Sequence, residues 1–134
     1  MNKLEGKIVN IESSPEMSIV QVDVSGDVFT SIVLETPETA PYLKLGAGIT
    51  VLFKETEVSL ATNLSGNISL RNRFKSPVKK IEKHGLLATV TLDYKGKDIV
   101  SIITSKSVDR LGLKEGESAE WLIKTNEVSL WHTT

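Results

Sequence analysis

The sequence predicts an all-β protein made of two tandem small Greek-key barrels, each with one short helix. Three observations lead to this prediction. The chain repeats itself after 70 residues, each repeat holds short stretches of alternating apolar and polar residues, and turn-forming Gly residues separate these stretches. Such alternation is typical of half-buried strands, and several short strands in a row favour a sandwich or barrel.

The repeat can be aligned without a gap. Residues 4–60 align with residues 74–130, and 16 of these 57 pairs are identical. Both copies end on the same four residues, EVSL, at 57–60 and 127–130. This level of identity over an ungapped stretch indicates a tandem duplication.

The duplication sets the predicted domain organisation. We expect a first repeat over residues 1–63 and a second over residues 69–134. The stretch ATNLSGNI, residues 61–68, contains turn-forming Asn and Gly and is the predicted linker.

The strands are clearest in the second repeat. The stretch LLATVTLDYKGKDIVSIIT, residues 86–104, alternates and is rich in β-branched residues, with a hairpin turn at 94–97. Ser25-Gly26-Asp27 is the matching turn of the first repeat. Further strands are expected over the ranges 77–82, 119–124 and 127–131.

One short helix is expected between Thr104 and Leu113, in the stretch TSKSVDRLGL. Thr or Ser can cap its start, Val108 and Leu111 are three residues apart, and Gly112 can end it. Five short strands and one short helix in about 65 residues predict a barrel that resembles the oligonucleotide/oligosaccharide-binding (OB) fold. Phe74, Trp121 and Trp131 are candidates either for the barrel core or for an interface.

The composition favours a soluble cytoplasmic protein. The chain has 134 residues, of which 40% are hydrophobic and 25% charged, and it contains no cysteine. This argues against disulfides, thiolate metal sites and cysteine nucleophiles. No stretch approaches the length of about 20 apolar residues that a membrane span needs, and no signal peptide is visible, so we expect no membrane association.

Charge is distributed unevenly along the chain. Residues 1–68 hold four Lys and nine Asp or Glu, a net charge of −5, whereas residues 69–134 hold twelve Lys or Arg and eight Asp or Glu, a net charge of +4. The cations begin in the stretch SLRNRF, residues 69–74, and continue to Lys83. Such a run is either a solvated strand face, which we expect for residues 79–83, or a surface that binds an anion.

Several stretches of the second repeat carry a family resemblance. SLRNRF, then SIITSKSVDRLGLKEG, then LIKTNEVSL are similar to the motifs S-A-R-N, I-T-x-x-S-V with L-G-L-x-x-G, and L-I-K-A-S-x-V of the Mop (molbindin or TOBE-type) domain. The first repeat is a weaker copy, so the chain resembles a tandem double-Mop protein. The resemblance implies cytoplasmic binding of molybdate or tungstate, in sites between domains of a homo-oligomer that is a trimer or a dimer.

The resemblance also implies the site residues. The positions that match the family motifs are Ser69, Arg71, Asn72, Thr104, Ser107, Lys124 and Thr125. Arg, Lys and hydroxyl side chains are the donors that a tetrahedral dianion requires. Asn72 is expected to orient the loop rather than touch the ion, and Thr125 to contribute through its backbone N–H.

The first repeat departs from this donor set. Leu34 stands in place of Thr104, Pro37 in place of Ser107, and Glu55 in place of Thr125. Proline has no backbone N–H, and a carboxylate repels an anion. We therefore expect the first repeat to lack a complete site of its own, although Lys54 remains.

Other functions are less well supported by the sequence. The two His residues lack metal-ligand spacing, and no nucleophile–base set is visible, so neither a metal site nor catalysis is expected. Single-stranded nucleic acid is disfavoured because only 5% of residues are aromatic. The alternative is a ligand-free interaction module that regulates a transporter ATPase or a transcription regulator.

Overall fold

The computed structural model describes residues 1–132 as ten strands, one α-helix and two 3₁₀ turns. The first repeat supplies β1 (Asn2–Ser13), β2 (Ser18–Val24), β3 (Asp27–Val33), β4 (Gly48–Phe53), η1 (Glu55–Glu57) and β5 (Ser59–Ala61). The second supplies β6 (Asn72–His84), β7 (Leu87–Tyr94), β8 (Lys97–Thr104), α1 (Ser105–Leu111), β9 (Ser118–Ile123), η2 (Thr125–Glu127) and β10 (Ser129–Trp131). Within this part of the chain, neither α1 nor the 3₁₀ turns have the length and apolar character needed to cross a bilayer.

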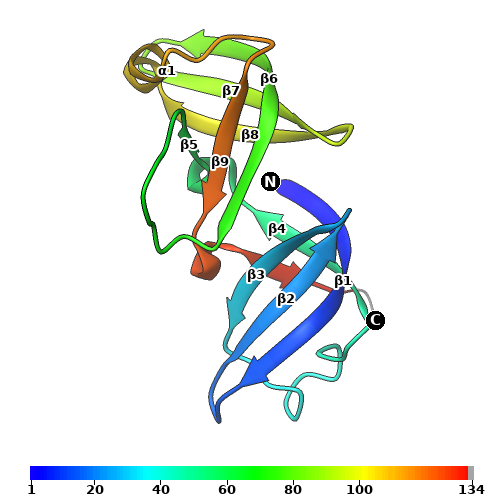
Figure 1. Ribbon diagram of the computed structural model, residues 1–134. Coiled ribbons are helices and arrows are strands. Elements are labelled where there is room, and N and C mark those ends of the chain that lie inside the picture. Colours follow the sequence, from blue (N-terminus) through cyan, green and yellow to red (C-terminus); the bar gives the residue numbers. More distant parts are fainter. Residues whose placement is uncertain (133–134) are drawn as a thin grey trace. The chain divides into compact units, whose positions relative to one another are not determined.

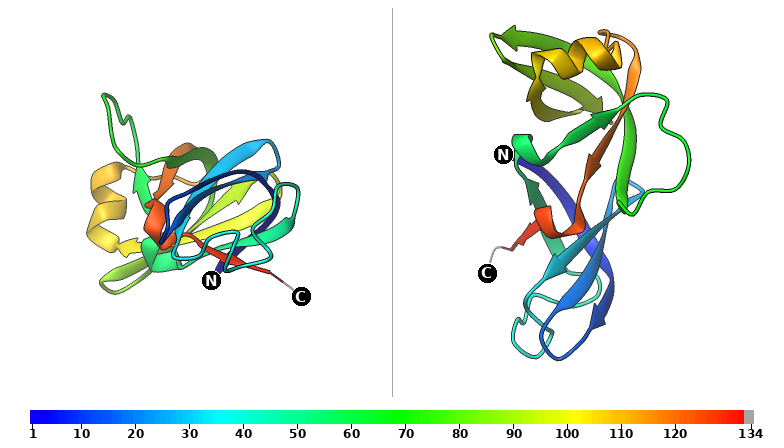
Figure 2. Two further views of the ribbon diagram at one scale, coloured as in Figure 1. Left: turned by 90° about the horizontal axis from the view of Figure 1, so that it is seen from below. Right: turned by 90° about the vertical axis from the view of Figure 1, so that its left-hand side faces the viewer.

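The strands form two five-stranded antiparallel sheets, and each sheet takes one strand from the other repeat (Figures 1 and 2). The first sheet has the order β10-β4-β1-β2-β3, and the second has the order β5-β9-β6-β7-β8. Leu130 of β10 pairs with Val51 of β4, and Leu60 of β5 pairs with Trp121 of β9. The closing strands of the two repeats are therefore exchanged.

The compact units follow this exchange. Unit 1 holds Lys3–Phe53 together with the segment that begins at Lys124, and unit 2 holds Asn2 and Lys54–Ile123. The predicted boundaries 1–63 and 69–134 follow the sequence repeat. In the structure, the two repeats have exchanged their closing strand together with the 3₁₀ turn that precedes it. In each unit the two outer strands contact one another, β10 with β3 and β5 with β8, so each sheet curls into a small barrel as predicted.

Two equivalent serines fasten the exchanged segments. In unit 1, the buried hydroxyl of Ser31 on β3 donates a 2.6 Å hydrogen bond to the main-chain carbonyl of Val128. In unit 2, Ser101 on β8 does the same to Val58 at 2.7 Å. A buried carbonyl without a partner is costly, so these bonds help to fix the closing segments.

Both predicted hairpin turns are confirmed. Ser25 and Gly26, and likewise Lys95 and Gly96, all have positive φ, which is typical of the two-residue turn that joins right-twisted antiparallel strands. In the second hairpin the backbone N–H of Gly96 also donates to the Asp93 carboxylate.

The cores combine the inward residues of both repeats. In unit 2, Trp121 is fully buried, its ring lies 4.8 Å from that of Phe74 and 5.3 Å from that of Tyr94, and its indole N–H donates to Ser76. Of the three aromatic candidates, Trp121 is therefore a core residue, while Trp131 is 54% exposed.

The predicted helix of the second repeat is confirmed as α1, but the matching helix of the first repeat is absent from residues 1–132. Thr104 caps the start of α1, and Gly112 ends it with φ 65°. In the first repeat the equivalent segment forms a single turn, in which Ala40 donates to the Thr36 carbonyl. The next residue, Pro41, has no N–H to continue the helix, which explains the difference.

Candidate functional site

The start of α1 carries two of the predicted donors, and the structure brings them into direct contact. The Thr104 hydroxyl accepts from the backbone N–H of Ser107 at 3.1 Å and donates to the Ser107 hydroxyl at 2.8 Å. Thr104 is therefore occupied as an N-cap, whereas the Ser107 hydroxyl keeps its own proton to donate outward. This geometry is compatible with both a helix cap and an anion ligand.

Ser69 and Arg71 lie on the irregular segment just before β6, and both are exposed. Neither side chain makes a hydrogen bond or ion pair within the described part of the chain, which leaves the guanidinium of Arg71 able to bind a ligand. Arg73, two residues on, differs because its guanidinium binds the Glu120 carboxylate through several hydrogen bonds of 3.0–3.2 Å. Only Arg71 of these two arginines offers an uncommitted planar donor.

Asn72 is fully buried at the first position of β6. Its equivalent in the first repeat, Asn2, uses its amide to bind both main-chain groups of Val100, donating to the carbonyl at 2.9 Å and accepting from the N–H at 2.8 Å. The amide therefore takes the place of a neighbouring strand. This supports a structural role for the motif's Asn, as expected, rather than contact with an anion.

The strand register relates Arg71 to Lys124. Asn72 pairs with Ile123 at the end of the antiparallel ladder between β6 and β9. Arg71 directly precedes Asn72, and Lys124 directly follows Ile123, so both cations stand where their strands leave the same end of the ladder. Residues 53 positions apart in sequence are thereby placed at one end of one sheet.

Lys124 and Thr125 open the η2 turn, which belongs to unit 1. The carbonyl of Lys124 accepts from the N–H of Glu127 at 2.9 Å, and the Lys124 side chain is exposed. Its ammonium makes no ion pair among residues 1–132. The predicted set is therefore divided, with Ser69, Arg71, Asn72, Thr104 and Ser107 in unit 2 and Lys124 and Thr125 in unit 1.

The first-repeat equivalents offer a poor environment for an anion. Leu34, which replaces Thr104, is 81% exposed and apolar. In η1, Lys54 has the same extended backbone as Lys124, but Glu55 places a carboxylate where the second repeat has Thr125. Because of the exchange, this acidic turn completes the same unit that carries α1.

The basic residues Lys79, Lys80 and Lys83 lie on an exposed strand face, as expected, and each has a carboxylate partner. Lys79 pairs with Asp98, Lys80 with Glu82, and Lys83 with Asp109. The hydrogen bond that the Lys79 ammonium donates to the Asp98 carboxylate raises the pKa of Lys79 above its ordinary value. These lysines already have carboxylate partners and are exposed, so they are poor candidates for a specific anion site.

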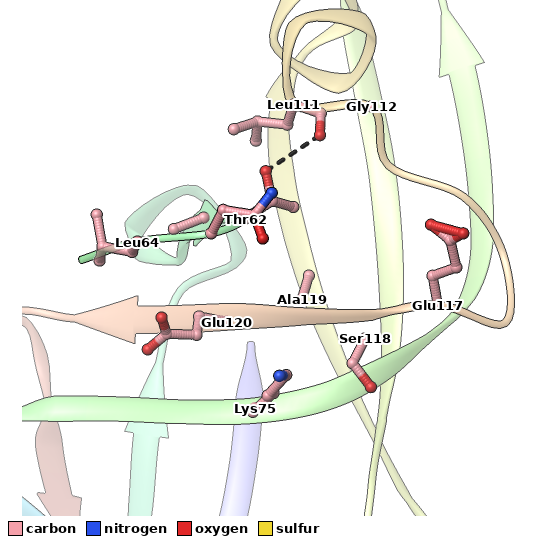
Figure 3. Close-up of a pocket in the computed structure, with 11 residues that line it drawn as sticks. Thr62, Leu64, Lys75, Leu111, Gly112, Glu117, Ser118, Ala119 and Glu120 are labelled. Atoms are coloured by element: carbon pink, nitrogen blue, oxygen red, sulfur yellow. Dashed lines mark hydrogen bonds between the residues drawn. The ribbon is translucent and has the colours of Figure 1, made fainter.

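A pocket of about 330 Å³ in unit 2 lies apart from the predicted donors (Figure 3). It is lined by the linker, the last residues of α1 and part of β9, and Thr62 donates across it to the Leu111 carbonyl at 3.1 Å. Glu117 and Glu120 contribute carboxylates and Lys75 the one cationic side chain of its lining. Acidic groups and the carbonyl end of a helix disfavour an anion there.

Tyr42, His132 and Glu35 form a cluster in unit 1 that the sequence analysis does not predict. The ring of Tyr42 stacks on that of His132 at 4.0 Å, and the Tyr42 hydroxyl donates to Glu35. Burial, followed by this bond to a carboxylate, raises the pKa of Tyr42 above its ordinary value. Sequence reasoning missed this cluster because its members are not equivalent in the two repeats.

Sequence reasoning also missed Ser31 and Ser101 as residues that hold the η2 and η1 turns, respectively. A signal was present, because this serine is identical in both repeats and falls on a strand that alternates toward the core. A buried hydroxyl at a duplicated position requires a partner. The identity of that partner was visible only in the structure.

Comparison with known proteins agrees with the fold of two small barrels. A family model described as the TOBE domain matches residues 68–130. The chain is 32% identical to the cytoplasmic molybdate-binding protein ModG, whose crystal structure contains molybdate; the two superpose with a TM-score of 0.90 over 96% of this chain and 94% of that one.

Two further relatives differ in length. Molybdenum-pterin-binding protein 3 of Clostridium pasteurianum is 37% identical over 65 residues, which cover 48% of this chain and 96% of that protein. The molybdenum transport protein ModE of Herbaspirillum seropedicae is 26% identical over 95% of this chain, and the chain spans only 48% of that protein's length. Since the match to ModG extends along both repeats and that to the clostridial protein covers about one repeat, the chain belongs to the TOBE family of Mop-type domains, as a tandem member with a degenerate first repeat.

Proposed function

We propose that this protein binds molybdate or tungstate in the cytoplasm and stores, buffers or senses the ion. The observation that carries the proposal is the placement of Arg71 and Lys124, two cations without carboxylate partners among residues 1–132, at the same end of the β6–β9 ladder. The similarity to ModG, which binds molybdate, supports the choice of ion.

The proposed donors suit a tetrahedral dianion. Arg71 supplies a planar fork of N–H groups and Lys124 a compact positive charge, while Ser69 and Ser107 supply hydroxyl donors. Thr125 contributes its backbone N–H, Thr104 holds the start of α1, and Asn72 holds the strand that follows Arg71. These groups bind and release the ion without a chemical step, so we assign no reaction to the protein.

Assembly of several copies is part of the proposal. The proposed donors are divided between unit 1 and unit 2. Near the start of α1, the hairpin tip exposes the apolar side chains of Leu86 and Leu87. The backbone carbonyl of Leu86 accepts a hydrogen bond from the backbone N–H of Ser105. A homo-oligomer, either a trimer or a dimer, would cover such residues and surround an ion with donors from more than one copy. Analytical ultracentrifugation with and without tungstate tests this part.

Titration calorimetry of the purified chain with molybdate, tungstate and sulfate tests the function. We expect saturable heat with molybdate and tungstate and much weaker binding of sulfate, which is a smaller tetrahedron. Absence of heat and of any thermal shift with all three ions would contradict the proposal. In that case, recovery of a stoichiometric protein partner would instead support a ligand-free interaction module.

A further inference from the structure

We infer that Ser31 of the first repeat is a positioning residue for oxyanion binding, because it holds the turn that presents Lys124 and Thr125. The inference rests on the proposed function and assigns the degenerate first repeat a part in it. Ser31 itself is buried and does not touch the ion.

The turn is anchored on both sides. On its N-terminal side, Ile123 is 1% exposed and pairs with Asn72 in the β6–β9 ladder. On its C-terminal side, Val128 is 2% exposed, and its carbonyl accepts the 2.6 Å hydrogen bond from Ser31. Only the four residues of the turn, Lys124 to Glu127, lie between these two anchors.

Within the turn, the main chain is held by the bond from the Glu127 N–H to the Lys124 carbonyl. This bond forms only while the Glu127 N–H points toward Lys124. The hydrogen bond from Ser31 to the carbonyl of the next residue, Val128, helps to keep it in that orientation. Donors that are held in place before the ligand arrives bind it more tightly, because less conformational freedom is lost on binding. Loss of the Ser31 hydroxyl should therefore weaken binding through Lys124 and Thr125 without removing either residue.

The same contact in unit 2 provides a matched control. Ser101 is as fully buried as Ser31 and donates to the Val58 carbonyl at 2.7 Å, which anchors the η1 turn. That turn carries Glu55 in place of Thr125, so it is a poor anion ligand. Ser31→Ala and Ser101→Ala thus remove equivalent hydrogen bonds, but only the first releases a turn with oxyanion donors.

The experiment is a tungstate titration of the full chain and of the two variants, with chemical denaturation of each. We expect Ser31→Ala to weaken tungstate binding about tenfold and Ser101→Ala to change it less than about threefold, with similar losses of stability in both. Amide hydrogen exchange at Glu127 should accelerate in Ser31→Ala alone.

Equal affinities of the two variants, or unchanged binding by Ser31→Ala, would overturn the inference while leaving the proposed function intact. If Ser31→Ala does not fold, Asn126→Gly loosens the same turn from an exposed position, and Thr56→Gly is its equivalent in η1. Equal tungstate affinity of that pair would again overturn the inference, and weaker binding by Asn126→Gly alone would support it. Absence of tungstate binding by the unmodified chain would contradict the proposed function and the inference together.

Discussion

The hydroxyl of Ser101 on β8 donates to the main-chain carbonyl of Val58, which belongs to the other repeat. Ser31 makes the same bond to Val128 in the opposite direction along the chain. Each barrel is therefore closed by a segment that the other repeat supplies. Through this reciprocal exchange, each repeat supplies the strand that completes the sheet of the other.

The bond from Ser101 should contribute measurably to stability. Ser101→Ala leaves the buried carbonyl of Val58 without a partner, so we expect the free energy of unfolding to fall by about 1–3 kcal/mol. Urea denaturation followed by circular dichroism measures the change. Ser129→Ala, at an exposed position of β10, is the control and should stay within about 0.5 kcal/mol of the unmodified chain. A Ser101→Ala variant as stable as this control would show that the bond is unimportant.

Arg71 should be required for oxyanion binding. Because a hydrogen bond to a charged group contributes about 1.5–3 kcal/mol, Arg71→Ala should weaken molybdate binding by roughly ten- to a hundredfold. Arg110→Ala removes another exposed arginine, in the last turn of α1, and should leave affinity unchanged. Titration calorimetry measures the molybdate affinity of both variants. If Arg71→Ala bound molybdate as tightly as Arg110→Ala, the site would lie elsewhere.

Lys124 and Lys54 occupy equivalent positions in the duplication, but we expect only Lys124 to matter for binding. Lys124→Ala should weaken tungstate binding at least tenfold, or by about 1.4 kcal/mol, because a cation next to the ion is lost. Lys54→Ala should have little effect, since Glu55 beside it disfavours an anion. A larger loss with Lys54→Ala would mean that the η1 turn, not the η2 turn, holds the ion.

Thr104 allows the roles of helix cap and anion site to be separated. Thr104→Asp and Thr104→Asn both retain a good N-cap, so α1 and the stability of the protein should change by less than about 1 kcal/mol. The added carboxylate of Thr104→Asp should abolish molybdate binding through repulsion, whereas the neutral Thr104→Asn should retain most of it. Equal binding by both variants would show that the start of α1 lies far from the ion.

Much of the fold could be predicted from the sequence because local patterns determined it. Gly96 and Gly26 fixed the hairpin turns through their positive φ, and the capping residues Thr104 and Gly112 fixed both ends of α1. The prediction of a helix in the first repeat is wrong because Pro41, whose missing N–H ends the turn after Ala40, has no counterpart in the second repeat.

The strand exchange could not be predicted, because the two closing segments are chemically alike. Both contain EVSL, at residues 57–60 and 127–130, so the sequence pattern does not distinguish which segment pairs with β4 and which with β9. Side-chain pattern specifies that such a strand is needed but not which copy supplies it. For the site, the motif positions give the proposed donors, whereas the contact of Ser31 with Val128 depends on the exchange and could not be seen in the sequence.

The most direct test is a crystal structure of the protein grown with tungstate, in which anomalous scattering locates the metal. The account predicts a tungsten peak within hydrogen-bonding reach of an Arg71 guanidinium, with Lys124 as a neighbour. A fully occupied peak in the pocket between Thr62 and Glu117, or beside η1 at Glu55, with none near Arg71, would contradict it.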